Sequence, residues 1–206
     1  MHRAALLIDF DGVLRLWPKD YASIEQSCGL PIGAICRLAF RSDLLLPVIT
    51  GSVSDRDWRS QIARILQAAH PLAKAAEAVD AWSSSAGAVD HDVKSLLQEV
   101  RAHCTLVLTT NATDRLPVDL AALGLSGFFD HVVNSSELRV AKPEHAYFQD
   151  ALRIAGVNPV SSYFVDDSAG NVAAAAAIGI TSHRYTSASG LRQWLVQQGF
   201  PILSAA

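Results

Sequence analysis

Two aspartates follow the first apolar run of the chain, and their spacing is the first indication of chemistry. The stretch LLIDFDGVL places Asp9 and Asp11 two residues apart, directly after the apolar residues 4–8. Neighbouring carboxylates repel each other, so the pair needs a cation, a shared proton or an exposed turn to offset the repulsion. If the chain stays extended here, both acids lie on one face and Phe10 points the other way, into apolar packing.

Further polar groups stand where later apolar runs end. A Thr-Asn pair follows the run 105–108, a lysine-proline pair precedes a helical pattern, and an Asp-Asp pair follows the run 163–165. Taken singly, each pair is better explained as a turn, a surface loop or a helix cap. Together with the first two aspartates they form an ordered set along the chain. Its further members are Thr110, Asn111, Lys142, Asp166, Asp167 and, four residues later, Asn171.

The elements that must position these residues are short strands alternating with helices. The apolar runs 4–8, 105–108, 131–133 and 163–165, with a weaker run at 181–185, have the length of strands buried on both faces. Helical spacing of apolar residues fills the gaps at 93–100, 148–155, 173–178 and 191–196. This alternation predicts an α/β fold, a Rossmann-like parallel sheet with helices on both faces. In such folds the ligand lies at the carboxyl ends of the strands, where the polar pairs stand.

Residues 16–88 break this rhythm and predict an all-helical cap domain inserted into the core domain of residues 1–15 and 89–206. The segment contains no convincing strand. Helices are predicted over 32–40 and 72–82, and an apolar stripe from Trp58 to Ala69 predicts a third that Ser54 caps. A serine-rich stretch at 83–87 predicts the return linker.

The ordered set resembles the motifs of the haloacid dehalogenase-like (HAD) hydrolase superfamily, with a cap inserted after the first motif. The stretch from Phe128 to Ser135, before Ala141-Lys142-Pro143, is also similar to the family's approach to its third motif. The resemblance covers roughly residues 1–15 and 89–198. It implies that Asp9 is a nucleophile forming an aspartyl-phosphate and that Asp11 is the general acid, then the base for water.

The resemblance also implies roles for the remaining residues. Thr110 and Asn111 would hydrogen-bond the phosphate, Lys142 would neutralise charge, and Gly12 would relax the turn and let a substrate approach the backbone. Mg²⁺ would be held by Asp9, by the backbone carbonyl of Asp11 and by Asp167, with Asp166 as a further candidate ligand, because this ion prefers oxygen ligands. Asn171 would orient these acids.

The implied reaction is the Mg²⁺-dependent removal of phosphate from a small phosphorylated metabolite. Family members that cleave carbon–halogen bonds generally lack the second aspartate and need no metal, which favours a phosphatase here. The alternatives are a phosphomutase similar to β-phosphoglucomutase, a metal-independent haloacid dehalogenase and a non-catalytic binding module. In the cap, Arg56 or Arg59 could bind a distal anionic group of the substrate, and Trp58 could stack on a ring. The favoured interpretation is that these residues form an exposed helix start whose Trp58 belongs to the cap core.

The composition is that of a folded domain with a sizeable core. Half of the 206 residues are hydrophobic, 18% are charged, and the formal net charge is −3. Lys and Arg are scattered, so no nucleic-acid partner is expected. No apolar run approaches the roughly 20 residues of a membrane span, and no signal peptide is predicted. Three cysteines without a Cys-x-x-Cys spacing favour reduced thiols in a cytoplasmic protein. The sequence does not indicate an oligomeric state.

Overall fold

A five-stranded parallel sheet lies at the centre of the α/β part of the molecule. The structure is a computed structural model, and it describes residues 4–18 and 21–202. The strand order is β5-β4-β1-β6-β7, so the first strand of the chain is the central one. The strands are β1 (Ala5–Ile8), β4 (Thr105–Thr110), β5 (His131–Asn134), β6 (Ser162–Asp166) and β7 (Thr181–Arg184). These are the five strands predicted from the apolar runs, and the predicted α/β fold is confirmed.

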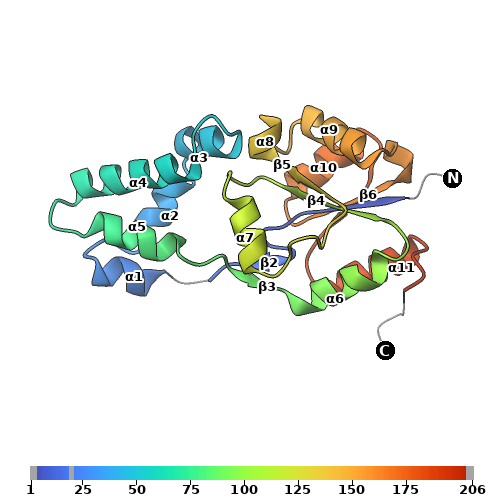
Figure 1. Cartoon of the computed structure of the whole chain (residues 1–206), viewed down its shortest axis with the longest axis horizontal. Helices are drawn as coiled ribbons and strands as arrows, with labels where there is room; N and C mark the ends of the chain where they lie inside the picture. Colours follow the sequence, from blue (N-terminus) through green and yellow to red (C-terminus); the bar gives the residue numbers. More distant parts are fainter. Residues whose placement is uncertain (1–3, 19–20, 203–206) are drawn as a thin grey trace.

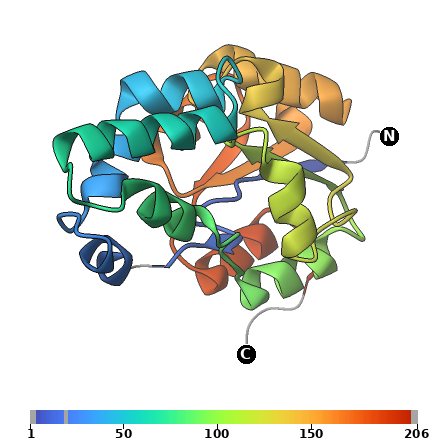
Figure 2. The ribbon, with the colours of Figure 1, turned by 60° about the vertical axis from the view of Figure 1, so that its left-hand side comes forward.

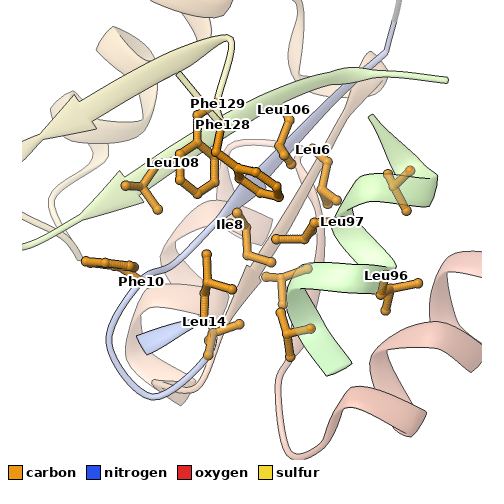
Figure 3. Packing of buried hydrophobic residues seen from close by; sticks show 14 of the residues in the cluster. Leu6, Ile8, Phe10, Leu14, Leu96, Leu97, Leu106, Leu108, Phe128 and Phe129 are labelled. Atoms are coloured by element: carbon orange, nitrogen blue, oxygen red, sulfur yellow. The ribbon is translucent and has the colours of Figure 1, made fainter. Parts of the chain in front are cut away.

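Helices cover both faces of this sheet, as Figure 1 shows. The side chains of β1 alternate, so that Leu6 and Ile8 pack with α6 and α11, while Ala5 and Leu7 pack with α9 and α10. The bounds are α6 (His91–Val100), α9 (His145–Ala155), α10 (Ala169–Ala177) and α11 (Ala188–Gln197). Phe10 is fully buried in the first of these clusters, as predicted (Figure 3). Both faces of the central strand are therefore buried, which explains its continuous apolar sequence.

Five helices pack together beside the α/β part and share a hydrophobic cluster of their own (Figures 1 and 2). They are α1 (Ala22–Ser27), α2 (Ala34–Ala39), α3 (Ser42–Ile49), α4 (Asp55–Ala69) and α5 (Ala75–Ser83). The predicted stripe of α4 is buried at Trp58, Ile62 and Leu66, and the Ser54 hydroxyl accepts a hydrogen bond from the Asp57 amide at the helix start. We call residues 16–88 the helical cap; its limits as a domain stay a prediction.

Several elements were not predicted. Helices α1, α3, α7 (Leu116–Ala122) and α8 (Ser135–Leu138) are short, and a helix of one or two turns shows little periodicity. A two-stranded antiparallel ribbon of β2 (Arg15–Leu16) and β3 (Ala88–Val89) joins the cap to the sheet, so strands do occur at the edges of the predicted helical insertion. Two-residue strands carry no readable pattern, because their pairing depends on residues that are far apart in sequence.

Parts of the two predicted domains lie outside the residues that the structure describes. Residues 1–3 of the predicted core, 19–20 of the predicted cap and 203–206 at the end of the chain are not described. Within the part of the chain that the structure describes, we find no helix that is long and apolar enough to cross a membrane.

Candidate active site

The predicted site residues converge at the carboxyl end of the sheet. Asp9 directly follows β1, Thr110 is the last residue of β4, and Asp166 is the last residue of β6. Because β4 and β6 are the two neighbours of β1, their ends lie on either side of Asp9. All three residues are buried. The parallel register therefore assembles residues that are more than 150 positions apart into one site.

Lys142 lies at the centre of these residues, and its ammonium group donates three hydrogen bonds. The acceptors are an oxygen of Asp9 at 2.8 Å, an oxygen of Asp166 at 2.7 Å and the backbone carbonyl of Thr109 at 3.0 Å. Burial by itself would lower the pKa of Lys142, but the two carboxylates outweigh it and hold the pKa above its ordinary value. The lysine is therefore a fixed positive charge between two buried acids.

The backbone of Lys142 is fastened by Asn111. The Asn111 side-chain amide donates to the Lys142 carbonyl and accepts from the Lys142 N–H, both at 2.9 Å. This pair of bonds joins the end of β4 to the loop that carries the lysine. Asn111 was predicted to bind phosphate; in the structure its amide connects two parts of the site, and it retains one further N–H donor for a ligand.

Burial has a strong effect on the predicted nucleophile. It raises the pKa of Asp9 to about 7, although Lys142 and the Phe10 amide lower it and Asp166 raises it further. The pKa of the partly exposed Asp167 is also raised, first by desolvation and then by the charge of Asp166. In both residues desolvation and the charge of Asp166 outweigh the opposing effect of Lys142. The one ammonium group therefore does not offset the cost of ionising these acids.

Three carboxylates form a group that suits a divalent cation. Asp9, Asp166 and Asp167 each offer an oxygen, and these oxygens all lie within 4.8 Å of one another. If all three acids are ionised, the positive charge of Lys142 balances one of them and a net charge of about −2 remains. Mg²⁺ prefers oxygen ligands, and its double positive charge would balance the remainder. The donor set therefore fits the predicted ion.

The two acids of the Asp-Asp pair have different surroundings. Asp166 is fully buried and accepts hydrogen bonds from Lys142, from the Ser168 amide and, at 3.0 Å on each oxygen, from the Asn171 side chain. Asp167 is exposed, and within the described residues no side chain forms a hydrogen bond or an ion pair with its carboxylate. Asn171 therefore orients Asp166 directly, and Asp167 is the freer of the two acids to coordinate an ion.

Gly12 is required by the close approach of Asp167. The glycine has a φ of +82°, and a Cβ at this position would lie 2.4 Å from a carboxylate oxygen of Asp167. A side chain would therefore meet both a strained backbone and a direct clash. The structure adds a reason that the sequence did not offer: the glycine leaves room for an acid of the site.

Asp11 is held by partners that sequence reasoning missed. Arg15 binds both carboxylate oxygens, through Nε at 2.6 Å and a terminal nitrogen at 2.8 Å, and the Trp17 indole N–H donates to the same group at 2.6 Å. The Arg15 guanidinium lies between the rings of Phe10 and Trp17, 4.2 Å and 4.4 Å from their centroids. Asp11 thus has its own cation and is not among the three clustered carboxylates.

A second aspartate supports Arg15 from α7. Asp119 accepts a hydrogen bond from Arg15 at 2.9 Å, and its other oxygen lies 2.9 Å from Nε of Arg115 in an ion pair without hydrogen-bond geometry. Arg15 and Asp119 are 104 residues apart in sequence. Arg15 follows Asp11 by four residues, a spacing at which opposite charges pair on a helix. This segment is a turn and a strand, so the helical rule did not predict the pair.

Another residue missed in the sequence is Tyr147, which is fully buried beneath the site. Its hydroxyl donates to the Val133 carbonyl at 2.8 Å and lies 3.4 Å from the Thr110 carbonyl. Burial raises the pKa of Tyr147 well above its ordinary value. The tyrosine is therefore a neutral support for the ends of β4 and β5.

The loop after β4 connects the site to the helical cap. The Thr113 hydroxyl donates to Asp55 at 3.0 Å, Asp114 accepts from the Asp55 backbone amide at 2.9 Å, and Arg115 donates to the Ser83 carbonyl at 2.6 Å. The residues that follow the predicted phosphate-binding pair therefore contact the starts and ends of cap helices. This places the cap over the carboxyl end of the sheet.

A cavity of about 590 Å³ lies between the cap and the site. Its lining includes Asp11, Gly12, Asn111 and Asp167 from the site, together with Arg15, Arg115 and Asp119. Of the cap candidates, Arg59 and Trp58 line the cavity. Arg56 is exposed and does not line it. Trp58 is also buried in the cap core, as the favoured interpretation had it. The same side chain lines the cavity, which that interpretation did not include.

A family model for haloacid dehalogenase-like hydrolases matches residues 4–179. The chain belongs to this family. The match spans most of the described sheet and the whole helical cap. The predicted resemblance to the superfamily is therefore confirmed.

Solved structures of similar fold include a phosphate complex of a HAD family enzyme and a haloacid dehalogenase. A HAD family enzyme from Bacteroides thetaiotaomicron, in complex with magnesium and inorganic phosphate, is 22% identical, with a TM-score of 0.74 over 89% of this chain and 94% of that one. A predicted HAD-like hydrolase from Porphyromonas gingivalis is 18% identical, with a TM-score of 0.73 over 96% and 98%. L-2-haloacid dehalogenase from Xanthobacter autotrophicus, with chloropropionic acid covalently bound, is 21% identical, with a TM-score of 0.63 over 99% and 86%. At these identities the likeness shows the fold of the hydrolase and leaves its reaction open.

Proposed function

We propose that this hydrolase is a Mg²⁺-dependent phosphatase of a small phosphorylated metabolite. The observation that carries the proposal is the group of three carboxylates around Lys142, whose oxygens lie within 4.8 Å of one another. A metal-independent reaction does not need three carboxylates arranged to hold an ion. The magnesium and phosphate complex of the Bacteroides thetaiotaomicron enzyme supports the same choice by analogy of fold.

Asp9 carries the phosphoryl group in the proposed reaction. One of its oxygens attacks phosphorus, the bond from phosphorus to the alcohol oxygen breaks, and an aspartyl-phosphate forms. Lys142 stabilises the charge on Asp9 and on the transferring group, since its ammonium already lies 2.8 Å from the carboxylate. Thr110 and the free N–H of Asn111 bind the phosphoryl oxygens from the end of β4.

Asp11 moves the protons on the other side of the phosphoryl group. It gives its proton to the departing alkoxide and then takes one from the water that attacks the aspartyl-phosphate, which releases phosphate and restores Asp9. In the structure Arg15 and Trp17 bind both oxygens of this carboxylate in the cavity wall, so Asp11 must give up a bond to Arg15 when it takes up the proton that it later donates. One carboxylate cannot carry the phosphoryl group and transfer the proton at the same time, so two are needed.

Mg²⁺ would be held by Asp9, Asp167 and the backbone carbonyl of Asp11, with Asp166 beside them, and when bound it supplies positive charge for the phosphoryl oxygens. Asn171 keeps Asp166 in place for this site through its two hydrogen bonds. The three cysteines form no disulfide with one another, which supports the proposal of a cytoplasmic protein.

The test is phosphate release from a panel of phosphorylated metabolites, with Mg²⁺ and with EDTA. We expect activity with Mg²⁺, none with EDTA and recovery when the metal is restored. Asp9→Asn should abolish turnover by at least about 10³-fold while the circular dichroism spectrum is retained. Full activity in EDTA or in Asp9→Asn would contradict the proposal. Chloride release from 2-chloropropionate would indicate the dehalogenase, and an isomerised sugar phosphate without free phosphate would indicate the mutase.

A further inference from the structure

The cap side of the cavity is a wall of aromatic and aliphatic side chains. Tyr21, Trp82 and Trp58 form a continuous row, with edge-on ring contacts at 6.4 Å and 5.8 Å between centroids. The rest of this apolar wall, as the structure describes it, consists of Cys36, Phe40, Leu45 and Ile49. These residues come from α2, α3, α4, α5 and the chain before α1, so five separate segments contribute apolar groups to one surface.

The arginines of the cavity are already paired. Among the described residues that line it, Arg15 is bound to Asp11 and Asp119, and Arg59 is bound to Asp55 and to the Ser83 hydroxyl. Arg115 pairs with Asp119 and the Ser83 carbonyl. The three arginine charges are thus balanced by the carboxylates of Asp11, Asp55 and Asp119, so a second anionic group on a substrate would find no uncompensated positive charge here.

Two hydroxyls that line the cavity already have partners, whereas the buried indole N–H of Trp58 has none among the described residues. The Ser83 hydroxyl donates to the Val79 carbonyl and accepts from Arg59, and the Ser85 hydroxyl accepts from the Gly87 amide. A ligand rich in hydroxyl groups would lose its water and find few partners here, which costs free energy for each unpaired group. The wall therefore disfavours sugars and favours apolar groups.

We propose that the substrate is a phosphate monoester whose alcohol part is uncharged and apolar, with a ring or branched chain that packs against the cap wall. The inference rests on the proposed phosphatase function, and it names the class of alcohol that the enzyme releases. The phosphoryl group lies at the acids of the sheet, and the apolar part fills the cavity of about 590 Å³ above it.

A matched pair of esters tests the inference. Cyclohexylmethyl phosphate and glucose 6-phosphate both release a primary alcohol attached to a six-membered ring, so the chemical step is similar and the polarity of the ring differs. With Mg²⁺ present, we expect kcat/KM for the cyclohexyl ester to be at least about tenfold higher. The same cyclohexyl ester carrying a ring carboxylate should lose most of this advantage, because aspartates already balance the arginine charges of the cavity.

Two cap variants identify the wall as the cause. Phe40 lines the cavity and is 63% exposed, so Phe40→Ser is compatible with folding and should raise KM for cyclohexylmethyl phosphate about fivefold. Leu72 is an exposed apolar residue of the cap that does not line the cavity, and Leu72→Ser should leave KM unchanged. Circular dichroism of both variants confirms that they are folded.

The outcomes separate this inference from the function on which it rests. Faster hydrolysis of glucose 6-phosphate, or equal rates for the two esters, would overturn the inference and leave the phosphatase standing. An unchanged KM in folded Phe40→Ser would also overturn it. No phosphate release from either ester or from the metabolite panel would overturn both proposals.

Discussion

Asp9 and Asp11 are two residues apart, yet they belong to two different regions of the molecule. Asp9 is 6% exposed and lies among buried acids that share one lysine. The side chain of Asp11 is 36% exposed and faces the cavity with an arginine and an indole of its own. The two acids have the same intrinsic chemistry, so the difference in their surroundings must set their roles.

The comparison shows how one short motif can supply two functions. Burial and a deficit of cations prepare the region of Asp9 for Mg²⁺ and a phosphoryl group. A cation, two aromatic rings and access to the cavity hold Asp11 where the alcohol leaves. The turn at Gly12 separates the regions, since the chain passes there from the sheet to the ribbon that leads to the cap.

Replacing Lys142 should have the largest effect, because this residue belongs to the region of Asp9 and not to that of Asp11. Lys142→Met leaves Asp9 and Asp166 facing each other in a buried site, so kcat should fall by at least about 10³-fold. The free energy of unfolding of the metal-free protein should fall by about 3 kcal/mol, because a broken buried pair leaves uncompensated charge. Phosphate-release kinetics and urea unfolding measure the two effects.

Lys74→Met is the matched control for this variant. Lys74 forms an exposed ion pair with Glu77 on the cap, and such pairs contribute little to stability. Activity and stability should therefore both stay near those of the parent protein. Equal losses in the two variants would show that the position of Lys142 between the acids has no special importance.

The region of Asp11 is tested by the leaving group. Asp11→Asn should lower kcat/KM about 10²-fold for an alkyl phosphate and much less for p-nitrophenyl phosphate, whose phenolate leaves without a proton. The ratio of the two kcat/KM values is the measurement. Equal losses would remove Asp11 from proton transfer and leave it as a partner of Arg15 only.

A smaller effect concerns the stability of the metal-free protein. The pKa of Asp9 is raised from 3.8 to about 7 in the folded state, so the folded state binds the proton more tightly than the unfolded state. This contribution to the free energy of unfolding is complete below the unfolded pKa and is lost as the pH rises through about 7. In EDTA we therefore expect a loss on the order of 2 kcal/mol between about pH 4 and pH 8.

Asp9→Asn should reduce this loss, because the amide does not titrate, and Mg²⁺ should stabilise the parent protein more at high pH than at low pH. Urea unfolding at several pH values, with and without the metal, measures both trends. The same pH dependence in Asp9→Asn as in the parent protein would assign it to other groups, such as Asp167, whose pKa is also raised.

Local patterns were sufficient to predict the sheet and the order of the motifs. Short apolar runs of three to five residues that alternate with helical patterns indicate the strands, and the polar residues at their ends indicate the edge where a ligand binds. The capping of α4 by Ser54 was visible for the same reason, since the cap and the helix are adjacent in sequence. The short helices α1, α3 and α8 were missed because they have too few turns for a periodic pattern.

The sequence by itself determined the strands, the inserted helical segment and the identity of the acids and the lysine, because each depends on neighbours along the chain. Only the tertiary structure decided how the acids are divided between two regions. Asp119 reaches Arg15 across 104 residues, Tyr147 supports Thr110 across 37, and the cap wall combines side chains from five segments. Contacts of this kind depend on how the elements pack, and no local pattern encodes them.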